Sequence, residues 1–160
     1  MKIKVKRKKR LTEFTLTEHG ITAFFMALLF LFGLYLSRTL SIPALLLYLL
    51  FWVASYFVIH GMTCRNCVYH GKHCPVPFQG SCSDIFFSKG KGFGPMSAIG
   101  VILTYSLRIC IPYAAISRSG SISDFISYTA VFMAFYYVLT FHTGCPNCIN
   151  LQCPMNPEHG

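Results

Sequence analysis

Seven of the eight cysteines lie in two short segments of the 160-residue chain. They are Cys64, Cys67, Cys74 and Cys82 in the first segment, and Cys145, Cys148 and Cys153 in the second. Each segment contains a Cys-x-x-Cys pair, a spacing at which two thiolates can turn toward one metal ion. Seven exposed thiols without such a role would be readily oxidised. The two segments are therefore predicted to bind metal.

Zinc is the metal that this ligand set predicts first, because zinc takes four sulfur or nitrogen ligands in tetrahedral geometry. The first segment supplies four thiols, whereas the second supplies three. His142 is the expected fourth ligand of the second site, and His159 is the alternative. In a further arrangement, the two segments share their ligands.

Two other chemistries stay open for these cysteines. Cys74-Pro75 and Cys153-Pro154 are similar to the Cys-Pro that ends ferredoxin motifs, which favours an iron–sulfur cluster, although the complete ferredoxin spacing is absent. Thiol–disulfide exchange by one Cys-x-x-Cys pair is the other alternative. Against it, no pattern of strands and helices typical of a thioredoxin fold surrounds either pair.

The two cysteine segments share a longer pattern. Both read His-x(2–3)-Cys-x-Asn-Cys-x(4–6)-Cys-Pro, and Cys64 and Cys145 lie 81 residues apart, which is half of the chain. Each segment also follows a pair of apolar stretches. We infer an internal repeat of two tandem helical hairpins, related by an approximate two-fold axis along the membrane normal.

Four apolar stretches are long enough to cross a bilayer as helices, which takes about 20 residues each. They cover residues 20–36 (extending to 40), 42–59, 95–116 and 122–141, with short polar connections at 37–41 and 117–121. Thr15 to Glu18 fits a capping box that begins the first helix. We therefore expect an all-α membrane protein with four transmembrane helices.

The organisation that follows has five parts. They are a basic N-terminus (1–19), transmembrane hairpin 1 (20–59), a cysteine-rich loop (60–94), transmembrane hairpin 2 (95–141) and a cysteine-rich tail (142–160). Composition agrees, because 54% of the residues are hydrophobic and 12% are charged, about half the charged fraction of soluble domains. These values exclude a disordered chain, and the length excludes a large multi-domain enzyme.

Basic residues predict the orientation. Seven lie within the first ten residues and four in the 60–94 loop, whereas the two short connections hold only Arg38 and Arg118. Positive charge favours the cytoplasmic side, so both termini and the loop are expected there, in the cell membrane. The cysteines would then face a reducing compartment, where metal binding is more common than disulfides. No aromatic interleaving accompanies the basic run, so lipid headgroups rather than nucleic acid are the expected partner.

Arg108 is the one strongly charged residue well inside a predicted span. We expect it to pair with Asp124 at the start of the fourth span or to extend toward the outer interface. No second buried acid is present to build a proton relay, which argues against a pump. Gly33, Ser97 and Gly100 are small residues at which helices can approach closely.

The motifs also resemble a known pattern. It consists of Tyr69 to Cys74, Phe87 to Gly90, and the two Cys-x-x-Cys pairs with Cys153-Pro154. Small, cysteine-rich, four-span prokaryotic membrane proteins without an established activity carry a similar pattern over the loop and tail. This resemblance implies no reaction. The predicted function is a metal-binding, non-catalytic module or accessory subunit that contacts the bilayer and other membrane subunits.

Overall fold

The computed structural model describes residues 11–156, and this part of the chain is helical. Its long helices are α1 (Leu16–Leu40), α2 (Ile42–Met62), α4 (Pro95–Ser119) and α5 (Ile122–Tyr137), the last continued by the π-helical segment η2 (Val138–Thr143). Shorter turns are η1 (Cys64–Asn66), α3 (Ser83–Phe86) and η3 (Cys145–Asn147). Four helices are long and apolar enough to cross a membrane, which confirms the predicted helical class and its four spans.

The first connection is shorter than predicted. Residues 37–40 continue α1, because Ser37 Oγ donates to Gly33 O at 2.7 Å and Thr39 Oγ1 donates to Leu36 O at 2.8 Å, so both hydroxyls are satisfied within the helix. Only Ser41 separates α1 from α2, and its Oγ accepts a hydrogen bond from Ala44 N at 3.2 Å. The predicted connection at 37–41 is therefore too long, whereas the extension of the first span to residue 40 is confirmed.

The second connection is formed by Gly120 and Ser121. Gly120 ends α4 in the left-handed conformation, with φ of 67°, and its N–H donates to Ile116 O at 2.9 Å. Ser121 Oγ then accepts from Asp124 N at 3.2 Å at the start of α5. Glycine adopts this conformation without the steric cost that a Cβ brings.

Gly120→Ala is expected to lower the free energy of unfolding by about 1 kcal/mol, because alanine resists a positive φ. A Cβ at Gly120 would meet no atom within 4 Å, so this loss reports the backbone alone. Thermal unfolding in detergent micelles measures it. Gly20→Ala is the matched control, since Gly20 lies in α1 with equally open space and is expected to gain stability. Equal losses in both variants would contradict the prediction.

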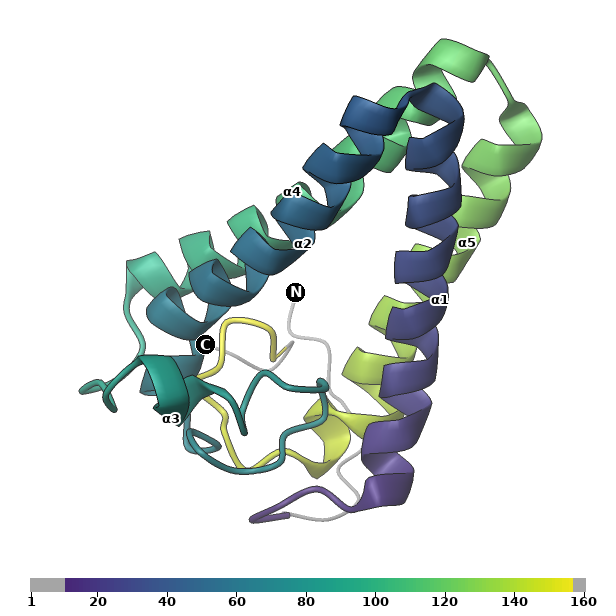
Figure 1. Cartoon of the computed structure of the whole chain (residues 1–160). Helices are drawn as coiled ribbons and strands as arrows, with labels where there is room; N and C mark the ends of the chain where they lie inside the picture. The colour runs from purple at the N-terminus through teal and green to yellow at the C-terminus, as the bar shows by residue number, and fades with distance from the viewer. Residues whose placement is uncertain (1–10, 157–160) are drawn as a thin grey trace.

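Figure 1 shows the long helices as two pairs, α2 beside α4 and α1 beside α5. The contact between α2 and α4 is the most extensive, and α1 contacts α2, α4 and α5 to a similar extent. The two pairs meet near the Ser41 and Gly120 connections and diverge toward the opposite end of the molecule. There, the segments that follow α2 and η2 lie between the diverging pairs. The helices thus hold both cysteine segments at one end.

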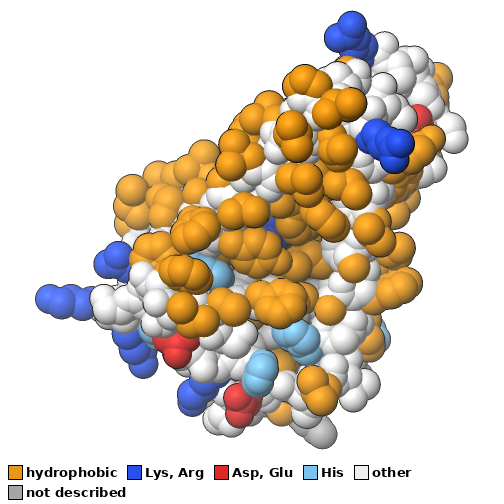
Figure 2. Space-filling view, in the orientation of Figure 1, with side chains coloured by type: hydrophobic (Ala, Val, Ile, Leu, Met, Phe, Trp, Pro, Cys, Tyr) orange, Lys and Arg blue, Asp and Glu red, His pale blue; other side chains and the backbone are white. Residues whose placement is uncertain are grey.

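Buried side chains between the helices form two clusters. One contains Met26, Tyr48, Trp52, Val76, Phe135 and Leu139, and the other contains Leu29, Leu36, Ala115, Ile116 and Tyr128. The outward faces of the long helices remain apolar, and Figure 2 shows hydrophobic side chains along the length of the molecule. An apolar surface of this kind fits contact with a lipid bilayer.

Small residues allow α2 and α4 to touch, as the sequence predicts. A Cβ at Gly100 would overlap Met62 Cβ and press on Thr63 Oγ1. Beside it, Ser97 Oγ donates to Met62 O at 2.8 Å and Thr63 Oγ1 donates to Ser97 O at 2.8 Å. The start of α4 is therefore fixed against the end of α2, immediately before Cys64.

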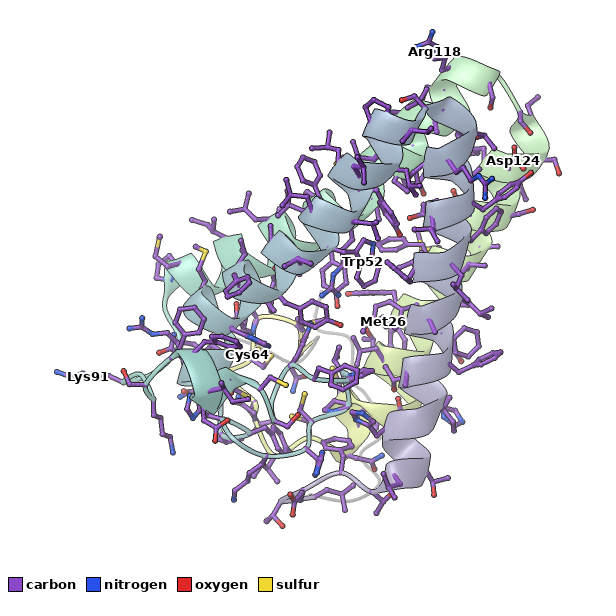
Figure 3. The ribbon with its side chains drawn as sticks, viewed as in Figure 1. Met26, Trp52, Cys64, Lys91, Arg118 and Asp124 are labelled. Carbon is purple, nitrogen blue, oxygen red and sulfur yellow. The ribbon has the colours of Figure 1, made fainter. Side chains whose placement is uncertain are left out.

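Arg108 does not pair with Asp124, contrary to the sequence-based expectation. Its side chain is 1% exposed, and its Nε donates to Ser55 Oγ on α2 at 2.9 Å. The guanidinium lies over the rings of Trp52 and Tyr56, with its Cζ 4.7 Å and 4.9 Å from the two centroids. Arg108 faces α2 because α4 packs mainly there, whereas Asp124 lies near the far end of the molecule (Figure 3).

Candidate metal centre

The two cysteine segments meet at one cavity of about 90 Å³. Six cysteines line it: Cys64, Cys67, Cys74, Cys145, Cys148 and Cys153. Three come from each segment, so the structure brings together residues that lie about 80 positions apart in the chain. The prediction that the two segments share ligands requires cysteines of both segments to lie together in this way.

Both Cys-x-x-Cys pairs are built in the same way. Each forms one helical turn, η1 or η3, in which the second cysteine N–H donates to the carbonyl of the first, at 3.0 Å for Cys67 and 3.2 Å for Cys148. The asparagines that precede the second cysteine of each pair, Asn66 and Asn147, also make equivalent hydrogen bonds. Asn66 Nδ2 donates to Met62 O at 3.3 Å and Asn147 Nδ2 donates to Thr143 O at 2.9 Å, each four residues back.

Asn150 connects the thiols of the two segments. Its backbone N–H donates to Cys148 Sγ at 3.3 Å, and its Nδ2 donates to Cys67 Sγ at 3.4 Å. Asn156 Nδ2 donates in turn to Asn150 O at 3.2 Å. Donors aimed at cysteine sulfurs are typical of metal centres, where they orient the ligands and tune the metal. The sequence analysis did not identify Asn150, although it lies two residues after a Cys-x-x-Cys pair.

Residues 11–14 cross both cysteine segments. Leu11 N donates to Asn147 O at 2.9 Å, and Phe14 N donates to His73 O at 3.2 Å. Tyr69 completes the junction, because its hydroxyl donates to Leu11 O at 2.6 Å and accepts from Ile149 N at 3.2 Å. One phenol, 2% exposed, thus joins three stretches of chain beside the cavity.

Tyr69→Phe is expected to lower the free energy of unfolding by roughly 1–2 kcal/mol, because it leaves Leu11 O and Ile149 N without this partner in a buried junction. Thermal unfolding of the purified protein measures the loss. Tyr35→Phe is the matched control, since Tyr35 is 60% exposed on α1 and is expected to unfold as the wild type does. Identical unfolding of Tyr69→Phe and wild type would contradict the bridging role.

Burial raises the pKa of the Cys67, Cys74 and Cys153 thiols, because desolvation disfavours the charged thiolate. Neighbouring cysteines raise the pKa of Cys74 and Cys153 further. Cys74 Sγ also donates to Val76 O at 3.0 Å. These thiols therefore keep their protons at neutral pH unless a cation replaces the protons.

The thiols surround the cavity without converging on one point. Within residues 11–156, no three His, Cys, Asp or Glu side chains are grouped closely enough to hold a single metal ion. The predicted four-thiol set of the first segment is also divided, because Cys82 lines a different and larger cavity. The structure therefore places six thiols around one cavity without forming a ligand set for a single ion.

Among residues 11–156, no histidine lines the thiol cavity. His142 is exposed on η2 and does not line it, and His70 Nε2 lies 2.9 Å from Phe87 O. His19 Nδ1 lies 3.0 Å from Cys74 O, beside the cysteine backbone. His159 falls outside the described residues. The six thiols are thus the donor atoms that the structure places together.

Comparisons of the chain with models of protein families, with curated proteins and with solved structures give no match. The class of protein therefore comes from the fold and composition alone. Four apolar helices of spanning length and eight cysteines indicate a multi-pass, cysteine-rich membrane protein.

Proposed function

We propose that this protein is a membrane module in which the two cysteine segments jointly hold one metal centre. The observation that carries the proposal is the single cavity lined by three cysteines from each segment. Metal binding there would fasten the segments to each other and to the diverging ends of the helix pairs. Such short segments bury little apolar surface of their own, so the metal would supply their folding free energy.

Zinc is the metal we propose first, as two ions in a bridged site. Two tetrahedral ions need eight ligand positions, and six thiolates provide eight when two of them bridge both ions. Each cysteine releases its thiol proton to solvent when it binds. The two N–H donors of Asn150 would still reach Cys67 Sγ and Cys148 Sγ. Their hydrogen bonds would stabilise the negative charge on these thiolates.

An iron–sulfur cluster is the second candidate, and the spread of the thiols favours it. A cluster brings its own sulfide and several irons, so its cysteine ligands need not converge on one ion. The donors from Asn150 to Cys67 and Cys148 fit a cluster as well. In that case the function would be electron transfer at the membrane.

Thiol–disulfide exchange has less support. The attacking group in that chemistry is a thiolate, which needs a lowered pKa and access to solvent. Burial instead raises the pKa of Cys67, Cys74 and Cys153. We therefore place the protein among non-catalytic, metal-stabilised modules, working as an accessory subunit whose apolar helix faces contact lipid and other membrane subunits.

The proposed arrangement in the cell membrane is two tandem hairpins with both termini and the 60–94 loop in the cytoplasm. The matching turns around Asn66 and Asn147 support the internal repeat. Protease sites inserted at Gly92 and Gly120, where a Cβ meets open space, test the orientation. Only the Gly92 site should be cut in inside-out vesicles, and only the Gly120 site in right-side-out cells. The reverse pattern would overturn this orientation.

Elemental analysis and a visible spectrum of protein purified anaerobically in mild detergent test the metal centre. A colourless protein with two zinc ions per chain is expected. Iron together with sulfide and visible absorbance would instead support the iron–sulfur cluster. A protein that carries neither metal, and takes up neither zinc nor iron with sulfide on reconstitution, would overturn the proposal.

A further inference from the structure

A second and larger cavity, of about 740 Å³, lies between α1, α2 and the segment that contains residues 77–86. Its volume is within the range of small-molecule sites in proteins, roughly 300–1,000 Å³. Met26 on α1 and Trp52 on α2 face each other across the space where the helices diverge (Figure 3). The small side chains of Ala23 and Ala27 leave space on the α1 side of the cavity, where an unbranched alkyl chain can lie.

Buried polar atoms without partners lie at this cavity. His60 and Trp52 line it and are 4% and 6% exposed. His60 Nε2 has no hydrogen-bond partner in the described part of the chain, and Trp52 Nε1, although the Tyr48 side chain lies beside it, makes no hydrogen bond of regular geometry there. The Arg108 guanidinium lies over the rings of Trp52 and Tyr56, which line the cavity. Its Nη2 also has no hydrogen-bond partner in the described part of the chain. Trp Nε1 and Arg Nη2 can only donate, so a complementary group must accept.

The charge on Arg108 strengthens this requirement. Within residues 11–156, its polar contacts are Ser55 Oγ and Met26 Sδ, at 2.9 Å and 3.9 Å, and no carboxylate. A buried cation with only neutral neighbours favours an anion nearby, because burial removes the solvation that a charge has in water. The aromatic rings of Trp52 and Tyr56 stabilise the cation but do not neutralise it.

The mouth of the cavity opens on an apolar surface. Val53, Phe57, Phe78 and Phe86 line the cavity and are each about half exposed or more. Figure 2 shows hydrophobic side chains across this face of the molecule. Because Val53 and Phe57 lie within a helix of spanning length, an occupant would enter from the hydrocarbon core of the bilayer.

We propose that this cavity binds a single-chain lipid carboxylate, that is, a fatty acid. The alkyl chain lies against Ala23, Ala27 and Phe57, and the carboxylate accepts hydrogen bonds from Trp52 and His60. Arg108 supplies the countercharge from behind them. This site is independent of the metal centre, because none of the six cysteines of the thiol cavity lines it.

Trp52 is the only tryptophan of the chain, so its fluorescence reports binding directly. The protein in lipid nanodiscs is titrated with brominated stearic acid, the matching alcohol and the matching trimethylammonium amphiphile. The acid is expected to quench Trp52 saturably, with an affinity at least tenfold higher than the other two. Arg108→Gln should make the three affinities equal.

A second variant keeps the test independent of Arg108 and of any folding defect that its loss causes. Ala27→Phe fills the cavity from α1 and should abolish saturable quenching, whereas Ala130→Phe, at an exposed position of α5, should leave it unchanged. Gel filtration verifies that each variant is folded. Equal affinities of the wild type for all three head groups, or undiminished quenching in Ala27→Phe, would overturn the proposal.

Discussion

Cys67→Ser is expected to release the metal bound by both cysteine segments, not half of it. Cys67 shares its cavity with the three cysteines of the second segment and accepts a hydrogen bond from Asn150 across the junction. A bridged centre that loses one of six thiolates cannot complete eight ligand positions. Structural zinc sites contribute about 10–16 kcal/mol of apparent binding free energy, so this end of the protein should also lose order.

Metal per chain, measured by mass spectrometry of the purified variants, tests this result. Two serine variants are matched controls that keep their metal: Cys110→Ser, at an exposed position of α4, and Cys82→Ser, at the larger cavity. Loss of half the metal in Cys67→Ser would indicate two separate sites. Loss of metal in Cys82→Ser would restore the four-thiol set predicted from the first segment.

The helices were predictable because each one carries its own signal. Hydropathy over about 20 residues identified all four, and Thr15 correctly placed the start of α1 at Leu16. Composition left two ends open for α1, residues 36 and 40, and the later one is confirmed because the hydroxyls of Ser37 and Thr39 donate to carbonyls of their own helix. Hydropathy also could not predict that the two helix pairs meet at one end and diverge at the other, because this arrangement depends on which helix faces pack together.

For the candidate site, the sequence predicted the ligand types and two ways of grouping them, either within each segment or shared between the segments. Spacing within one segment led to a four-thiol set with Cys82, whereas the structure groups cysteines across the two segments and directs Cys82 elsewhere. The sequence indicated no bridging role for Tyr69 or Asn150, yet both join the segments through long-range hydrogen bonds. The partner of Arg108 was mistaken for a similar reason: charge alone favoured Asp124, but helix packing aims the guanidinium at Trp52 and Tyr56.

Gly100→Leu is expected to have the second largest effect, because Gly100 lies where α4 touches the end of α2. The new side chain would collide with Met62 Cβ, which is fixed to the backbone and cannot rotate away. Overpacking of this kind costs about 3 kcal/mol, more than the gain of about 1 kcal/mol from the better helix propensity of leucine. Unfolding in detergent, followed by circular dichroism, measures the loss.

Gly20→Leu provides the matched control, since Gly20 also lies in a long helix and a Cβ there meets no atom within 4 Å. It should be as stable as the wild type or more so. Because Met62 and Thr63 lead directly into Cys64, displacing α2 from Gly100 should also move Cys64 and reduce the metal content of Gly100→Leu. Full metal content in a destabilised Gly100→Leu would mean that the cysteine segments hold the centre without help from the α2–α4 contact.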